Sequence, residues 1–204
     1  MGSPTSARRR PRPPSDHLAV RAARLRIHGV PGVTDDERAE HAALRAAERA
    51  RAIAYLDLEE NRGPVPVLDS EAAGEVLRSA RRIAVVGASS NPGRPSFGVF
   101  RYLLHQGYDC VPVNPGERDV LGVPAFRTLR EAVDGTGPFD IVDVFRRSEL
   151  CLPHAREAVD VGARCLWLQL GVINWEAARI AHDGGLAVVM DRCTAIEHRR
   201  LRGR

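Results

Sequence analysis

The sequence predicts an α/β protein with three layers, in which a doubly wound, Rossmann-like parallel sheet of five strands lies between two layers of helices. Three observations predict this fold. From residue 69 onward, short apolar runs alternate with segments of helical length. The apolar runs are continuous, as in parallel strands that are buried on both faces. Glycine follows several of the expected helices, at Gly107, Gly162 and Gly184, where a helix C-terminus favours it.

The chain is expected to have three parts. Residues 1–33 are rich in Pro, Arg and Ser, which predicts a disordered basic leader. Residues 34–68 are expected to hold a peripheral helix and a linker. Thr34 and Glu37 form a capping box that begins this helix, which is expected to reach about residue 57. Residues 69–204 are expected to form the folded, ligand-binding domain.

Within the folded domain, strands and helices are expected in strict alternation. The expected strands cover residues 83–87, 108–113, 140–145, 164–168 and 186–190. The expected helices cover residues 70–80, 96–106, 128–133, 148–161, 174–183 and 194–201. Because crossovers between parallel strands are right-handed, this alternation favours a doubly wound sheet. We expect the strand order 3-2-1-4-5.

Charge and composition narrow the classes of function. Residues 69–204 carry 18 Arg and 17 acidic residues, so the net charge of +4 belongs to the leader. A nearly neutral folded domain makes nucleic acid an unfavoured partner. No apolar run reaches the ~20 residues of a membrane helix, and no apolar secretory segment begins the chain. The four cysteines form no C-x-x-C pair, which favours the reducing cytoplasm.

The segment from Ile83 to Ser96 runs from a strand through a small-residue loop into a helix. Free N–H groups and the helix dipole favour an anion at such a point. The segment is neither of the two common phosphate loops. Ser89 and Pro92 replace the second and third glycines of the dinucleotide fingerprint, and Arg94-Pro95 replaces the Lys-Ser/Thr of the P-loop. A phosphate cradle of a third kind is predicted, with a plain turn as the alternative.

Doubly wound sheets bind ligands beyond the carboxyl ends of their strands. The residues at these ends offer guanidinium groups for phosphate, and Phe145 with Val172-Ile173 for a planar ring. Asp143 and Asp191 are equally compatible with simple pairing to Arg. No Ser-His-Asp set and no metal spacing can be recognised, which favours a binding protein without catalysis. The candidate residues, strand by strand, are Gly87, Ala88, Ser89, Asn91, Arg94 and Ser96; Asn114 and Pro115; Asp143, Phe145, Arg146 and Arg147; Gln169 and Gly171; and Asp191, Arg192 and Cys193.

Five motifs in this order resemble the CoA-binding-domain proteins. These are small bacterial stand-alone relatives of the CoA-binding domain in succinyl-CoA synthetase and ADP-forming acyl-CoA synthetases. The resemblance covers about residues 69–202, and it implies a Rossmann-like domain that holds CoA. The motifs are Ile83–Ser96, Val113–Pro115, Asp143–Arg147, Trp167–Val172 and Val189–Cys193.

The resemblance also implies a role for each group of candidates. The residues from Gly87 to Ser96 would cradle the pyrophosphate. Asn114, Pro115 and residues 143–147 would border the adenosine, with Arg146 or Arg147 free for the ribose phosphate. Gln169, Gly171 and residues 191–193 would lie further along the same edge.

The expected function is therefore the binding of a small molecule, CoA or an acyl-CoA, by a non-catalytic module. One alternative is an NAD(P)-dependent oxidoreductase or sensor. Another is a subunit of an acyl-CoA ligase that needs a partner chain, and a homodimer is also open. If the pantetheine thiol reaches Cys193, a mixed disulfide with CoA could form; an unreactive, packed Cys193 is the simpler interpretation.

Overall fold

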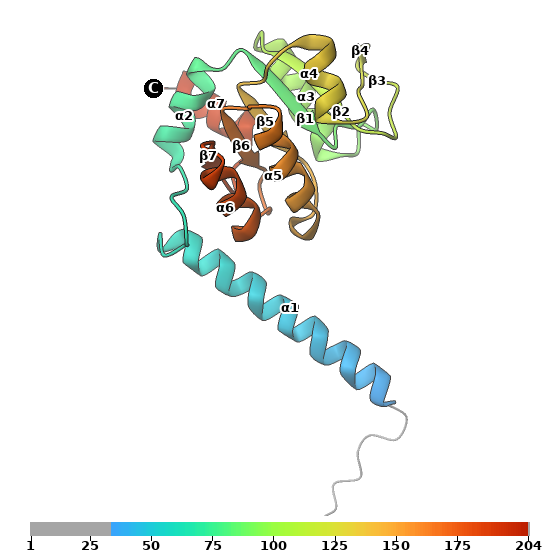
Figure 1. Ribbon diagram of the computed structural model, residues 1–204, viewed down its shortest axis with the longest axis vertical. Helices are drawn as coiled ribbons and strands as arrows, with labels where there is room; N and C mark the ends of the chain where they lie inside the picture. Colours follow the sequence, from blue (N-terminus) through green and yellow to red (C-terminus); the bar gives the residue numbers. More distant parts are fainter. Residues whose placement is uncertain (1–33, 204) are drawn as a thin grey trace, which may run out of the picture. The chain divides into compact units, whose positions relative to one another are not determined.

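The computed structural model describes residues 34–203 (Figure 1), so the predicted leader, 1–33, lies outside the described residues. The chain divides into two units at residues 45 and 46, and the sheet belongs to the second. The α/β fold class is confirmed. The helices are α1 Asp35–Glu59, α2 Ser70–Ser79, α3 Pro95–His105, α4 Leu129–Thr136, α5 Cys151–Asp160 with the preceding 3₁₀ turn η1 Ser148–Leu150, α6 Trp175–Asp183 and α7 Thr194–Arg202. The strands are β1 Arg82–Val86, β2 Asp109–Val113, β3 Asp119–Val120, β4 Val123–Pro124, β5 Ile141–Val144, β6 Cys165–Leu168 and β7 Ala187–Val189.

Helix α1 begins at the predicted capping box. The Glu37 N–H donates to Thr34 Oγ1 at 3.2 Å, and the Thr34 N–H donates to Glu37 Oε2 at 2.6 Å. None of the residues of α1 is buried. No helix among residues 34–203 is long and apolar enough to cross a membrane.

The five main strands are parallel, but their predicted order was wrong. The observed order is β2-β1-β5-β6-β7, which is 2-1-3-4-5 when only these strands are numbered. The physical reason is Pro112 in β2, which lacks an N–H and is therefore suited to an edge strand. On the outer side of β2, the Pro112 carbonyl accepts the Phe126 N–H at 2.9 Å. The third main strand, β5, pairs instead with the free side of β1.

A hairpin that was not predicted covers the outer edge of β2. Its strands, β3 and β4, are antiparallel and are joined by Leu121 and Gly122, both with positive φ (53° and 80°). Such a turn matches the twist of two short antiparallel strands. The chain then returns to β2 through an isolated bridge between Val113 and Phe126. The hairpin thus limits the sheet on this side.

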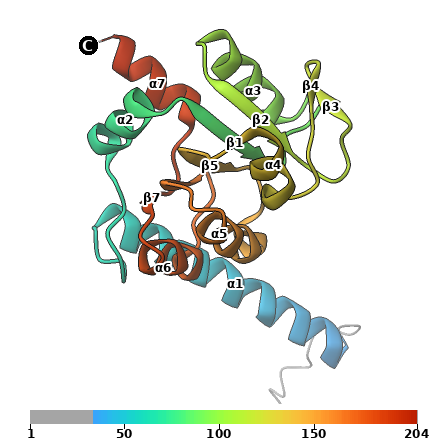
Figure 2. The ribbon, with the colours of Figure 1, turned by 45° about the horizontal axis from the view of Figure 1, so that its top comes forward.

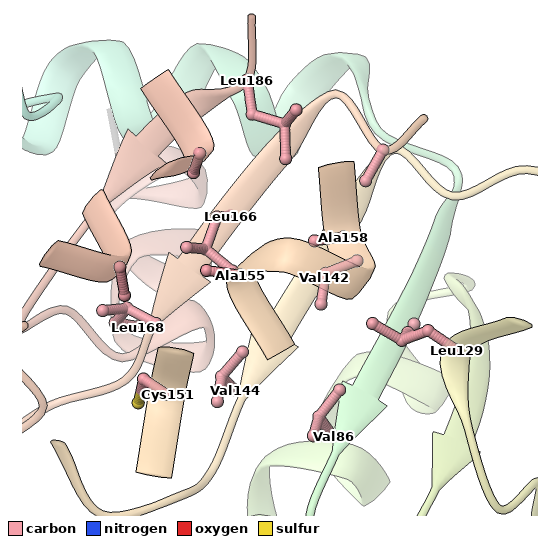
Figure 3. Packing of buried hydrophobic residues seen from close by; sticks show 14 of the residues in the cluster. Val86, Leu129, Val142, Val144, Cys151, Ala155, Ala158, Leu166, Leu168 and Leu186 are labelled. Carbon is pink, nitrogen blue, oxygen red and sulfur yellow. The ribbon is translucent and has the colours of Figure 1, made fainter. Parts of the chain in front are cut away.

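The helices cover both faces of the sheet (Figure 2). Helices α4, α5 and α6 pack on one face, and α2, α3 and α7 on the other. Figure 3 shows the first face, where the side chains of β5 and β6 meet those of α5. Small residues on α5, Ala155 and Ala158, let this helix approach the strands, and both are fully buried. This arrangement leaves the strand ends open to a ligand.

Residues before the first sheet strand also belong to the core. The Leu68 N–H donates to the Val188 carbonyl at 2.8 Å, so the chain pairs with the outer edge of β7. An unpaired strand edge would otherwise be open to other chains. Gly63 lies directly under the Trp175 ring, whose Nε1 donates to the Ala54 carbonyl at 3.3 Å. The segment from residue 54 to 68 is therefore anchored on α6 and β7.

A pair of glycine substitutions tests this anchoring. A Cβ at Gly63 would lie 1.9 Å from the Trp175 ring, so Gly63→Ala must displace the indole. We expect the free energy of unfolding in urea to fall by about 1–3 kcal/mol. In α3, a Cβ at Gly98 meets nothing within 4 Å, so Gly98→Ala should raise stability by about 0.5–1 kcal/mol. Equal effects of the two variants would contradict the contact.

Candidate functional site

The winding of the chain reverses between the neighbouring strands β1 and β5. These two strands are neighbours, but β1 continues into α3 on one face and β5 continues into α5 on the other. In open parallel sheets, such a divergence forms the ligand crevice. A cleft of about 620 Å³ lies here, lined by Gly87, Ser89, Arg94, Pro95, Ser96, Val99, Asn114, Phe145, Arg146, Arg147, Gln169, Leu170, Val172, Cys193 and Ile196.

Gly87 brings the two sides of this cleft together. It has φ +81°, and a Cβ at this position would lie 2.6 Å from the Phe145 carbonyl oxygen and 3.1 Å from Arg146 Cδ. No other residue type fits this contact without moving the backbone after β5. The Gly87 N–H donates to the Val113 carbonyl at 2.8 Å, which extends the β1–β2 pairing. The loop after β1 is thereby fixed against the loop after β5.

Two helices begin at the cleft without a side-chain cap. These are α3, whose N-cap is Arg94, and α7, whose N-cap is Cys193. By contrast, α2, α4 and α6 are capped by Asp69, Thr128 and Asn174. Uncapped N–H groups at a helix N-terminus favour an anion.

The loop before α3 adds further free donors. Among the described residues, the backbone N–H groups of Ser89 and Ser96 have no hydrogen-bond acceptor. Ser96 is only 4% exposed, and its hydroxyl is likewise without a partner in this part of the chain. Within residues 34–203, every fully inaccessible side-chain oxygen or nitrogen has a partner, so the Ser96 hydroxyl must be accessible from the cleft that the residue lines. The cradle thus presents donors that no protein group uses.

Three guanidinium groups line the same cleft. Arg94, Arg146 and Arg147 are exposed, and none of their guanidinium groups forms a hydrogen bond or an ion pair with residues 34–203. Arg192 is different, because its Nη1 lies 3.8 Å from Oε1 of the buried Glu197, which also accepts from Arg200 at 2.7 Å. Arg192 is therefore held by the protein, whereas the other three arginines remain available to an anionic ligand.

Glu117 supports the cradle from outside the cleft, and the sequence did not predict it. Its Oε1 accepts from the Ser89 hydroxyl and the Ser90 N–H, both at 3.0 Å, and its Oε2 accepts from the Ser90 hydroxyl at 2.7 Å. These hydrogen bonds, chiefly those from Ser90, lower the pKa of the Glu117 carboxyl. The carboxylate thus orders the loop, but it occupies the Ser90 N–H, which is then not available to an anion.

A buried carboxylate lies directly behind the cleft. Asp143 is fully buried, and both of its oxygens accept from Gln169 Nε2, at 2.8 and 2.9 Å. The Thr194 hydroxyl donates to Asp143 Oδ2 at 3.0 Å. Burial raises the pKa of Asp143 to about 7, although these hydrogen bonds oppose the shift. Asp143 thus joins β5 to the end of β6 and to the start of α7, and it does not pair with an arginine.

Asp191 also has a structural partner other than arginine. Its Oδ1 accepts the Gly171 N–H at 2.6 Å, and its backbone has φ +52°. A positive φ in a non-glycine residue turns the chain sharply after β7. This turn directs residues 192 and 193 back toward the end of β6.

The predicted site residues thus separate into two groups. Those that line the cleft are Gly87, Ser89, Arg94, Ser96, Asn114, Phe145, Arg146, Arg147, Gln169 and Cys193. Those that lie outside its lining are Ala88 and Asp143, which are fully buried, and Asn91, Pro115, Gly171, Asp191 and Arg192.

The prediction missed the apolar part of the lining on the two helices. Pro95 and Val99 belong to the first turns of α3, and Ile196 follows Cys193 by three residues at the start of α7. Helical spacing of three or four residues places such side chains on one face. Leu170 is 62% exposed and was also missed, whereas Val172 was expected to border a planar ring. The sequence signal that could have identified these residues was the helical spacing of apolar side chains at the start of each helix.

The fold and the cleft define a Rossmann-like α/β protein with a ligand site at its topological switch point. Residues 81–199 match the family model described as a CoA binding domain, which covers more than half of the chain. The chain therefore belongs to the CoA-binding-domain family.

Relatives of known sequence and structure agree with this assignment. The uncharacterized protein YneT of Bacillus subtilis (strain 168) is 42% identical over 124 residues, which cover 61% of this chain and 90% of that protein. A solved structure of a hypothetical protein from Pyrococcus horikoshii OT3 is 37% identical, with a TM-score of 0.63 over 67% of this chain and 94% of that chain. The alpha subunit of acetate–CoA ligase (ADP-forming) II of Pyrococcus furiosus is 30% identical over 125 residues, but only 27% of that protein is covered.

The buried Asp143 predicts a pH dependence of stability. Its pKa is about 7 in the folded state against an ordinary value of 3.8, so the folded protein binds this proton more tightly than the unfolded chain does. The stabilisation is fully present below about pH 4 and is lost as the pH rises through about 7. Urea unfolding from about pH 4 to about pH 8 should show this loss in the parent protein and a smaller one in Asp143→Asn.

The control for this measurement is Asp134→Asn, which removes an exposed carboxylate on α4. It should follow the parent protein at every pH. If the free energies of unfolding of the parent protein and of Asp143→Asn changed in parallel with pH, the raised pKa of Asp143 would be contradicted.

Proposed function

We propose that this protein binds CoA or an acyl-CoA in the cleft between β1 and β5. The observation that carries the proposal is the convergence of three unpaired arginines, Arg94, Arg146 and Arg147, on a cleft where two helices begin without caps. A ligand with several phosphates and an apolar part matches this combination of charge and surface. Membership of the CoA-binding-domain family supports CoA as that ligand.

The proposed contacts follow the two sides of the cleft. The loop from Gly87 to Ser96 cradles the pyrophosphate through its free N–H groups and Arg94. Arg146 or Arg147, after β5, binds the ribose phosphate, since guanidinium groups bind phosphate through paired hydrogen bonds. The apolar surface of Phe145, together with Val99, Leu170, Val172 and Ile196, accommodates the uncharged parts of the ligand.

An NAD(P)-dependent enzyme is the weaker alternative. Dinucleotide-binding domains place an acidic residue at the end of the second strand, where it binds the ribose hydroxyls. Here β2 ends before Asn114, whose Nδ2 donates to the Ala88 carbonyl at 2.7 Å and whose Oδ1 accepts the Gly116 N–H at 3.0 Å. The amide is therefore occupied in holding the loops, and no carboxylate replaces it.

A role as one subunit of an acyl-CoA ligase is a second alternative. The similarity to the Pyrococcus furiosus ligase subunit favours it, although this chain corresponds to only 27% of that subunit. Such a role would need a partner chain to supply the remaining chemistry. We propose binding without catalysis, because the cleft residues form no recognisable nucleophile–base pair among the described residues.

Calorimetry with CoA, dephospho-CoA and NAD at moderate salt tests the proposal. CoA should bind most tightly. Dephospho-CoA, which lacks the ribose phosphate, should bind about tenfold to a hundredfold more weakly, because a lost charge-assisted hydrogen bond costs about 1.5–3 kcal/mol. Equal affinity for NAD and CoA would support the oxidoreductase alternative instead.

Single arginine substitutions identify the contacts. Arg94→Ala and Arg146→Ala should each weaken CoA binding by about tenfold to a hundredfold, with the folded structure retained in circular dichroism. The matched control is Arg156→Ala on α5, which removes the same charge from an exposed residue outside the cleft lining. If Arg156→Ala weakens binding as much as the two cleft variants, the contacts are not where we place them.

A further inference from the structure

Cys193 differs from the other three cysteines of the chain. Cys110, Cys151 and Cys165 are buried, and Cys193 is partly exposed. Burial raises the pKa of Cys151 to about 11 and raises the pKa of Cys110 and Cys165 still further. Buried thiols of this kind keep their protons and react slowly. Cys193 is therefore the one cysteine placed to react with a molecule in the cleft.

Two hydrogen bonds bring Cys193 from the end of β7 to the cleft. Trp167 Nε1, on β6, donates to the Arg192 carbonyl at 2.6 Å. Gln169 Nε2 donates to the Thr194 hydroxyl at 2.8 Å. These bonds flank Cys193 on both sides and hold it over the end of β6. As a result, Cys193 lines the same cleft as the phosphate loop after β1.

Two nearly buried residues that line the cleft together with Cys193 carry polar atoms that no described residue satisfies. Ser96 and Gln169 are each only 4% exposed. Neither the Ser96 hydroxyl nor Gln169 Oε1 forms a hydrogen bond with any of residues 34–203. Both atoms are accessible, since no inaccessible side-chain oxygen in the described part of the chain lacks a partner, and both residues line the cleft. A polar ligand would satisfy them.

We propose that Cys193 is a modification site that takes CoA from CoA disulfide and holds it in the cleft as a mixed disulfide. This inference rests on the proposed binding of CoA. The phosphates seat on the loop from Gly87 to Ser96, and the pantetheine arm passes Gln169 toward Cys193. Position 193 is the N-cap of α7, and no side chain caps this helix start, which opens at the cleft.

The exchange is balanced without any further reagent. The Cys193 thiol releases its proton to solvent, and the thiolate attacks one sulfur of CoA disulfide. A bond forms between Cys193 Sγ and that sulfur while the original S–S bond breaks. Cys193 is oxidised, and the second CoA leaves as a thiolate that takes a proton from solvent. A thiol reductant reverses the step.

Intact-mass spectrometry without reductant tests the proposal on the full chain. After incubation with CoA disulfide, we expect one CoA-sized adduct that dithiothreitol removes and that peptide mapping places on Cys193. Cys193→Ser should form no adduct, and Cys151→Ser should form it as the parent protein does. An adduct on another cysteine would overturn the proposal.

A second disulfide separates guided exchange from general thiol reactivity. Glutathione disulfide has no adenosine phosphates, so it should modify Cys193 at least about tenfold more slowly than CoA disulfide. Arg94→Ala should slow the reaction with CoA disulfide and leave that with glutathione disulfide unchanged. Equal rates for the two disulfides in the parent protein would overturn the proposal.

Calorimetry with reduced CoA distinguishes a failure of the mixed disulfide from a failure of CoA binding itself. If CoA binds both the parent protein and Cys193→Ser but no adduct forms, the mixed disulfide is wrong and the proposed function stands. If CoA binds neither protein, the proposed function itself fails.

Discussion

The close approach of the loops after β1 and β5 is the constraint on which the site depends. At Gly87 the backbone has φ +81° and lies so close to the Phe145 carbonyl that a Cβ would be 2.6 Å from its oxygen. This contact sets the spacing between the loop after β1 and the two arginines after β5. It also brings the Arg146 stem to Gly87, where Arg146 Cδ would lie 3.1 Å from a Cβ. A looser contact would separate the groups that the cleft brings together.

The helices differ in whether a side chain satisfies the N–H groups of their first turn. At the starts of α2 and α4, away from the cleft, the side chains of Asp69 and Thr128 satisfy the first N–H groups, whereas α5, which continues the 3₁₀ turn η1, has no side-chain cap. Where α3 and α7 begin at the cleft, no side chain does so. Since orphaned N–H groups need partners, the starts of α3 and α7 leave donors at the cleft that are open to an anion. The buried Asp143 ties these parts together, because it links β5, Gln169 and the start of α7.

Much of the fold could be predicted from local patterns. Apolar runs and capping residues gave the strands and the helix starts to within a few residues, as at Thr128 and Asn174. The order of the strands could not be read from periodicity, because both common orders satisfy right-handed crossovers. Pro112 carried the missing information, since it assigns β2 to an edge. In the site, residues next to strand ends were found, whereas contacts made across space, such as that of Glu117 with Ser90, leave no local pattern.

The pairing of Leu68 with Val188 has a consequence for the limits of the folding unit. The family match begins at residue 81, after this pairing and after α2. A protein shortened to the matched region would bare the β7 backbone and the apolar surface that Ala73 and Leu77 now cover. An unpaired strand edge can form hydrogen bonds with a strand of a neighbouring molecule. The residues that shield it thus keep the domain self-contained, although they lie outside the region by which the family is recognised.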